Sequence, residues 1–124
     1  MKFLRALPLL ALLGFTTVQA SAQTSPAATA KTSGTATAKF KTSAVCDMCK
    51  TRLEKSMAYE KGVQSANLDV PSQVLTVTYR QDKVSEAALR TAVQKTGYDA
   101  DDAPADSRAY NRLPDCCKKT NAVH

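Results

Sequence analysis

The sequence predicts an α+β fold in which two helices cover one face of a four-stranded antiparallel sheet. Two observations lead to this fold class. Short runs that alternate between apolar and polar residues, as half-buried strands do, recur at four places in the chain. Two stretches that are free of proline and rich in helix-forming residues follow the first and the third of these runs. All six elements fall within residues 38–102. The chain therefore holds one small domain with polar segments on both sides.

The first strand is expected from residue 38, where Phe40, Thr42 and Ala44 alternate with lysine and serine. A helix is expected over residues 50–61, with Gly62 as its C-terminal stop. Residues spaced four apart share one face of that helix and should be buried together. They are Cys49, Leu53 and Met57.

Two further strands are expected at 63–70 and 74–79, joined by a turn. The second of them is β-branched or aromatic almost throughout. Ser85 is a typical N-cap for a second helix that ends at Gly97. Its buried face is expected to consist of Leu89, Ala92 and Val93. A short last strand at 98–102 completes a ferredoxin-like βαββαβ sandwich.

The N-terminal segment has the three-part pattern of a secretory signal peptide. Lys2 and Arg5 precede an apolar run at 6–15, and Ala20-Ser21-Ala22 is a small-x-small cleavage site. The run is too short to cross a bilayer, so no stable membrane insertion is expected after cleavage behind Ala22. The predicted location is the periplasm or the exterior, and residues 23–37, rich in Thr, Ser and Ala, are predicted to form a disordered linker.

Charge and composition exclude several functions. Removal of residues 1–22 lowers the formal net charge from +6 to about +4, and the remaining basic residues are scattered. The chain has no tryptophan and no basic stripe interleaved with aromatic residues, so a nucleic-acid partner is not expected. No acid–base pair or phosphate-binding loop is visible, and we do not predict an enzyme.

The four cysteines form two local pairs, Cys46/Cys49 and Cys116/Cys117. Local pairs close small loops and constrain the unfolded chain little, which favours reactivity or metal binding over structural disulfides. The first pair lies between a strand and a helix. The second lies in the C-terminal tail (residues 103–124), which is polar and is predicted to lack a core of its own.

A thiolate at the start of a helix is stabilised by the helix dipole and by free backbone N–H groups. Thiolates select soft or borderline ions, so Cys46 and Cys49 are candidate ligands for Cu(I), Hg(II), Cd(II) or Zn(II). Two sulfurs from one loop suit Cu(I) or Hg(II) best, because Zn(II) normally takes four ligands. Two alternatives remain open: a passive disulfide formed after export, and a periplasmic thiol–disulfide redox protein.

The sequence resembles the heavy-metal-associated domain of copper chaperones, metal-transporting P-type ATPases and mercuric-ion-binding periplasmic proteins. The resemblance rests on four short motifs within residues 38–102. They are SAVCDMC at 43–49, Gly62-Val63, VLTVTY at 74–79 and TGYDA at 96–100. The family loop is Gly-Met-x-Cys-x-x-Cys, which assigns its two cysteines to Cys46 and Cys49. Ser43 and Ala44 replace the family's Gly and Met, which affects the rigidity expected of the loop.

The resemblance implies a protein that scavenges a soft cation or passes it to a metal transporter or another metal-binding domain. In the family fold the last strand begins near the cysteine loop, which places Tyr98 beside Cys46 and Cys49 as a shield around the ion. The 14 residues of 103–116 could span about 45 Å when extended. We therefore hypothesise that Cys116 or Cys117 folds back and supplies a third or fourth thiolate.

Overall fold

The computed structural model of the protein describes residues 34–124. The signal peptide predicted at 1–22 and most of the linker predicted at 23–37 lie outside these residues. The elements, in chain order, are β1 (Thr35–Lys41), α1 (Asp47–Ala58), β2 (Val63–Asp69), β3 (Val74–Arg80), α2 (Glu86–Thr96), α3 (Ser107–Asn111) and the 3₁₀ turn η1 (Asp115–Cys117). Within the described range, no helix has the length and apolar character that a membrane span requires.

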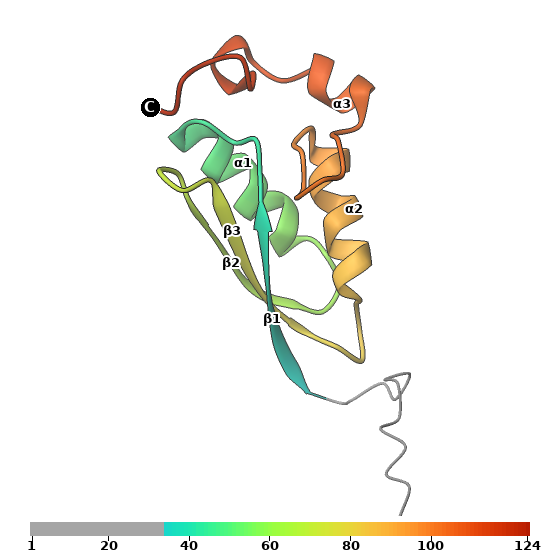
Figure 1. The fold of residues 1–124 in the computed structure, drawn as a ribbon. Helices are drawn as coiled ribbons and strands as arrows, with labels where there is room; N and C mark the ends of the chain where they lie inside the picture. The colour runs from blue at the N-terminus through green and yellow to red at the C-terminus, as the bar shows by residue number, and fades with distance from the viewer. Residues whose placement is uncertain (1–33) are drawn as a thin grey trace, which may run out of the picture.

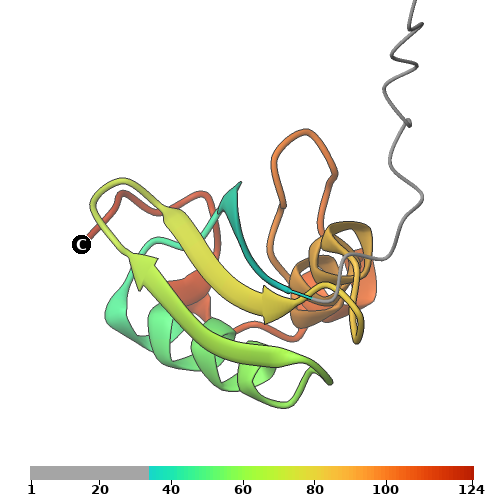
Figure 2. The same ribbon diagram turned by 90° about the horizontal axis from the view of Figure 1, so that it is seen from below.

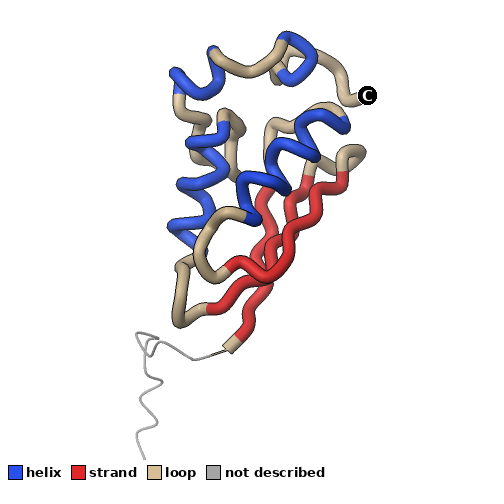
Figure 3. The backbone as a smooth tube through the Cα atoms, turned by 180° about the vertical axis from the view of Figure 1, so that it is seen from behind, coloured by secondary structure: helices blue, strands red, loops and turns tan. Residues whose placement is uncertain are grey.

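The three strands form one antiparallel sheet in the order β1-β3-β2. β3 occupies the centre, as its β-branched and aromatic sequence favours, and it pairs along its whole length with β1. Both long helices lie on the same face of this sheet, as the view from behind shows (Figure 3). The α+β class and the helical layer on one face agree with the sequence prediction.

The sheet has three strands among the described residues, and the prediction of a fourth strand at 98–102 was wrong. Only single bridges remain there, from Ala100 to Thr42 and to Ala103. Asp101, at φ 53°, turns the chain back immediately. Its carboxylate accepts a hydrogen bond from the N–H of Lys41 at 2.9 Å and so takes the place of a ladder carbonyl.

β1 begins at Thr35, inside the segment predicted as linker, and not at residue 38. The alternation of the first strand continues upstream in small residues, because Ala36 packs against the core and Ala38 is buried. Threonines occupy the intervening positions, and threonine favours strands. The small side chains concealed this part of the strand, since a Thr/Ala run is also typical of a flexible linker.

Helix α1 is displaced toward the N-terminus relative to its predicted range of 50–61. It begins at Asp47, directly after Cys46, and ends at Ala58. Gly62 is therefore not its C-terminal cap, although its φ of 91° does serve the turn into β2. Helix α2 follows the prediction closely, because the Ser85 side chain caps its start and Gly97, in the left-handed conformation, ends it.

The core lies between the sheet and the two long helices. All members of the two predicted helical faces are buried, as are the inward residues of β3. The fully buried large side chains are Tyr98, Phe40, Leu53, Met57, Leu68, Leu75, Leu89, Val45, Val77 and Val93, together with Cys49 and Cys117. Three cysteines thus belong to the core, Cys46 and Cys49 from the start of the domain and Cys117 from the tail.

The C-terminal tail folds back over the end of the domain that carries the cysteine loop. Figure 1 shows it in red, running across the C-terminal end of α2 and then over the start of α1, and the view from below agrees (Figure 2). It packs through Leu113, which is 5% exposed and lies against Gly97. Leu113 and Cys117 belong to the core cluster of the domain, so the tail is an integral part of the domain surface.

Candidate functional site

The loop between β1 and α1 presents the first cysteine pair at a helix N-terminus. Cys46 is the N-cap residue of α1, with extended backbone angles, and its carbonyl accepts the N–H of Lys50 at 3.0 Å. Cys49 lies in the first turn of the same helix. Both thiols are buried, and their Sγ atoms are 3.1 Å apart. The two sulfurs predicted as ligands therefore face each other at the point where the helix dipole favours negative charge.

The tail brings the second cysteine pair to the same place. The Sγ of Cys117 lies 3.8 Å from that of Cys46, and the side chain of Cys117 is fully buried. Cys116 is partly exposed, and its thiol points to the Sδ of Met48 at 3.7 Å. The sulfurs of Cys46, Cys116 and Cys117 all lie within 4.8 Å of one another. Sequence reasoning allowed this approach of the tail, and the structure places the thiols together.

The thiol pKa values differ within the cluster. Burial raises the pKa of Cys46, and its hydrogen bond to Cys49 adds to the increase. Burial also raises the pKa of Cys117, again together with a hydrogen bond to Cys49. At Cys49 burial acts in the same direction, but the hydrogen bonds from Cys46 and from the backbone at Val45 outweigh it and lower the pKa. Cys49 is thus the thiol that ionises first, and its neighbours donate to it.

Tyr98 lies where the family resemblance predicted, against the cysteine cluster. Its side chain is fully buried. Burial raises its pKa, and the neighbouring Cys49 and Cys117 add to the increase, so the phenol stays protonated. The hydroxyl nevertheless makes no hydrogen bond of standard geometry within the described part of the chain. This hydroxyl is therefore free to donate a hydrogen bond to an electron-rich group beside the sulfur atoms.

The cysteine loop is held by its neighbours through four hydrogen bonds. Thr42 Oγ1 accepts the N–H of Ala44 at 3.3 Å, and Gln73 Nε2 donates to the Ala44 carbonyl at 2.8 Å. The Ser43 hydroxyl accepts the N–H of Asp99 at 2.9 Å. From the tail, the N–H of His124 donates to the Val45 carbonyl at 2.8 Å. Ala44 itself is fully buried. The loop is therefore fixed by polar contacts, although it lacks the Gly-Met of the family loop.

Asp99 connects the loop to both ends of the tail. One carboxylate oxygen accepts the N–H of Ala105 at 2.8 Å, and the other lies 3.0 Å from the ammonium of Lys119. Its own N–H is bound by Ser43, three residues before Cys46. Sequence analysis did not select Asp99, because a single aspartate in a turn carries no signal of what it contacts.

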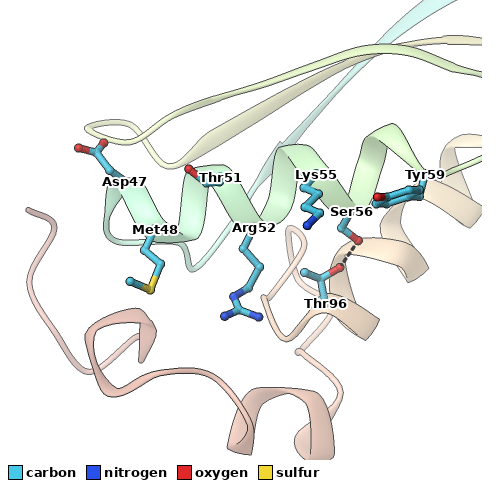
Figure 4. Close-up of a pocket in the computed structure, with 8 residues that line it drawn as sticks. All are labelled: Asp47, Met48, Thr51, Arg52, Lys55, Ser56, Tyr59 and Thr96. Carbon is cyan, nitrogen blue, oxygen red and sulfur yellow. Dashed lines mark hydrogen bonds between the residues drawn. The ribbon is translucent and has the colours of Figure 1, made fainter.

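An open pocket of about 690 Å³ lies beside the cluster, along α1. Figure 4 shows Met48 and Arg52 pointing from α1 toward the tail, while Asp47 and Thr51 point away from it. Farther along the pocket, Ser56 and Thr96 join α1 to α2 through their hydroxyls. The tail thus meets α1 at its first turn, through the contact of Cys116 with Met48, and the pocket itself is lined by α1 and by Thr96 of α2. Met48 is the one sulfur-bearing residue near the site that sequence analysis did not select, since its only signal was a position between the two cysteines.

The fold and the site define a class of small α+β domain that presents a Cys-x-x-Cys pair at the start of its first helix. The profile of the heavy-metal-associated domain matches residues 40–99. The copper chaperone CopZ of Staphylococcus haemolyticus is 33% identical over 54 residues, which are 44% of this chain and 79% of the relative. The chain belongs to the heavy-metal-associated domain family.

Other similar proteins match a similar share of the chain. A copper-exporting P-type ATPase of Staphylococcus aureus is 34% identical over 59 residues, 48% of this chain but 7% of the ATPase. A solved CopZ metallochaperone has a TM-score of 0.51 at 24% identity and covers 52% of this chain and 98% of its own. The structure of oxidized MerP from Ralstonia metallidurans CH34 has a TM-score of 0.52 at 22% identity. It covers 54% of this chain and 94% of its own. These two structures agree in fold, and all these matches cover only about half of this chain.

Proposed function

We propose that this protein binds a soft metal cation, Cu(I) or Hg(II), through Cys46 and Cys49 and either scavenges it or passes it to a partner. One observation carries the proposal: in a chain of the heavy-metal-associated domain family, two thiols meet at 3.1 Å on a helix N-terminus. Thiolates prefer soft ions, and the dipole favours their ionisation. Zn(II) and Cd(II) are weaker candidates, because they ask for more ligands than one loop supplies.

Transfer to a partner would proceed by thiolate exchange. A partner thiol forms a bond to the ion, one bond from the ion to a cysteine of this protein breaks, and the proton of the incoming thiol moves to the released one. No electrons are exchanged in this step. The similarity to a copper chaperone and to part of a copper-exporting ATPase supports a metal transporter or another metal-binding domain as the partner.

Export is a further part of the proposal. The segment at 1–22 has the pattern of a cleavable signal, which would deliver the mature protein, beginning at Gln23, to the periplasm or the exterior. In an oxidising compartment the cysteine pair must be kept reduced or loaded with metal in order to work. Intact mass and cell fractionation of the expressed protein test this: a full-length mass in the cytoplasm contradicts export.

Anaerobic titration of the reduced protein tests metal binding. With a coloured Cu(I) chelator as competitor, the wild-type chain should take one equivalent of Cu(I), and Cys49→Ser should compete far less well. Thr51→Ala, on the same helical turn but outside the sulfur cluster, is the matched control and should behave as the wild type. Equal competition by the wild type and Cys49→Ser would refute the proposed ligand pair.

The alternative function is a thiol–disulfide redox protein. The contact between two thiols and the lowered pKa of Cys49 would also suit that chemistry. The two functions differ in what they require: a redox protein turns over a disulfide substrate without metal, whereas a metal carrier does not. Assay of disulfide reduction by the metal-free reduced protein therefore separates them.

A further inference from the structure

We propose that Cys117 is a third ligand of the ion, so that the C-terminal tail converts the open cysteine pair into a closed three-thiolate site. This inference rests on the proposed function and deepens it. The sulfur of Cys117 lies 3.8 Å from that of Cys46, and its side chain is fully buried in the same cluster. No other segment of the described chain brings a further cysteine to the loop.

The sulfur separations favour three ligands over two. With metal–sulfur bonds of about 2.3 Å, sulfurs lie about 4.0 Å apart around a trigonal ion and about 4.6 Å apart across a linear one. The 3.8 Å between Cys46 and Cys117 already matches the trigonal spacing. The 3.1 Å between Cys46 and Cys49 must widen by about 0.9 Å for a trigonal ion but by about 1.5 Å for a linear one. Both separations from Cys46 therefore lie closer to the trigonal spacing than to the linear one.

Cys117 is the buried cysteine of the tail, whereas Cys116 is partly exposed, although its sulfur also lies within 4.8 Å of those of Cys46 and Cys117. The thiol of Cys116 points to the sulfur of Met48 at 3.7 Å and is partly exposed. Cys117, by contrast, interacts with both Cys46 and Cys49 and lies against Tyr98. Adjacent cysteines on one turn direct their side chains differently, and here they provide one inner and one outer thiol. Cys116 is thus the competing candidate, and separate substitution of the two cysteines decides between them.

The approach of Cys117 is built into the fold. Leu113 is buried against Gly97, and Asp99 holds the tail at Ala105 and at Lys119. At its end, the N–H of His124 donates to the carbonyl of Val45, next to Cys46. These contacts position the tail on both sides of Cys117. They also limit the entropy lost when its thiol binds an ion, because the segment is already ordered.

Tyr98 provides an independent indication that a ligand group belongs in this cluster. Its hydroxyl is fully buried beside the sulfurs of Cys49 and Cys117 and makes no hydrogen bond of standard geometry within residues 34–124. Leaving such a buried donor unpaired costs free energy. A metal-bound thiolate is electron-rich and would accept this hydrogen bond. The phenol would then both satisfy its donor and orient the ligand sulfur.

A site closed by the tail has a consequence for transfer. Cys46 and Cys49 lie on the loop and first turn of α1, between the sheet and the core, whereas Cys117 lies on the C-terminal tail, which carries no strand of the sheet. Cys117 is therefore the ligand that an incoming partner thiol displaces first. The metal–sulfur bond to Cys117 breaks, the bond to the partner forms, and the released thiolate takes up the proton that the partner thiol loses.

X-ray absorption of the full reduced chain loaded with one equivalent of Cu(I) tests the proposal. The expected result is three sulfur neighbours in the wild type and in Cys116→Ser, and two in Cys117→Ser. Groups outside the ligand set commonly contribute about 10- to 100-fold to metal affinity, so loss of a ligand should cost at least about tenfold in competition with a chelator. Cys116→Ser should keep the wild-type affinity.

Several outcomes would overturn the inference. Two sulfur neighbours in the wild type would refute it and leave the proposed function standing, whereas no Cu(I) binding at all would refute both. Loss of a sulfur neighbour in Cys116→Ser but not in Cys117→Ser would mean that Cys116, and not Cys117, is the third ligand. If Cys117→Ser does not fold, the sulfur count of the wild type still decides between two and three ligands.

Discussion

Leu113→Ala should release the tail without unfolding the domain. Truncation of a buried leucine costs about 2–5 kcal/mol, and the value here should lie near 2, because Leu113 also borders a small surface pocket into which its surroundings can relax. This loss corresponds to an increase of about 30-fold in the equilibrium constant for tail opening. Amide hydrogen exchange measured by mass spectrometry should show faster exchange in the tail and unchanged exchange in β3.

The control for this experiment is Val123→Ala, which removes an apolar side chain of the same tail that is 42% exposed. Its exchange pattern should equal that of the wild type. Equal acceleration in the tail and in β3 of Leu113→Ala would mean that the tail and the sheet open as one cooperative unit. Unchanged tail exchange would mean that Leu113 does not anchor the tail, and either result would refute the reasoning.

Three further substitutions test the fold. Leu53→Ala should lower the unfolding free energy by about 2–5 kcal/mol in urea titrations, whereas the exposed Thr51→Ala should stay within about 0.5 kcal/mol of the wild type. Ser85→Ala removes the N-cap of α2 and should cost about 1 kcal/mol in the same assay. Hydrogen bonds from Ser72 lower the pKa of Asp69, so Asp69→Asn should destabilise the protein above about pH 4 and lose this effect as the carboxyl protonates at lower pH.

Much of the fold could be predicted because its elements carry a periodic pattern. Helix α1 repeats buried residues at every fourth position, from Cys49 to Met57, and β3 alternates from Leu75 to Tyr79. The ends of α2 are marked by a serine cap and by Gly97, whose left-handed φ of 110° is difficult for other residues. Patterns of this kind reflect burial along a whole element, and they are therefore visible in the sequence.

The loss of the expected fourth strand and the path by which the tail folds back both depend on single contacts. The expected fourth strand is reduced to bridges because the side chain of Asp101 binds the backbone of β1, which no periodicity reveals. The tail folds back through one buried leucine, Leu113, and through Asp99, which binds both of its ends. A single leucine or aspartate gives the same sequence signal whether its segment is disordered or packed against the domain.

The candidate site divides in the same way. The pair Cys46/Cys49 was predictable from its spacing and its position before a helix. Tyr98 was predictable only through the family resemblance, because nothing in its local sequence indicates what it faces. The approach of Cys117 was one hypothesis among several, since a tail of this length can reach many places, and the geometry of the structure selects it.

Native mass spectrometry of the full reduced chain, mixed anaerobically with Cu(I), Hg(II) and Zn(II) in competition, tests the central claim most directly. The account predicts one bound ion per chain, Cu(I) or Hg(II) in preference to Zn(II), and loss of that ion in a Cys46→Ser/Cys49→Ser double variant that remains folded. A protein that remains metal-free, or equal metal loading of the double variant, would contradict it.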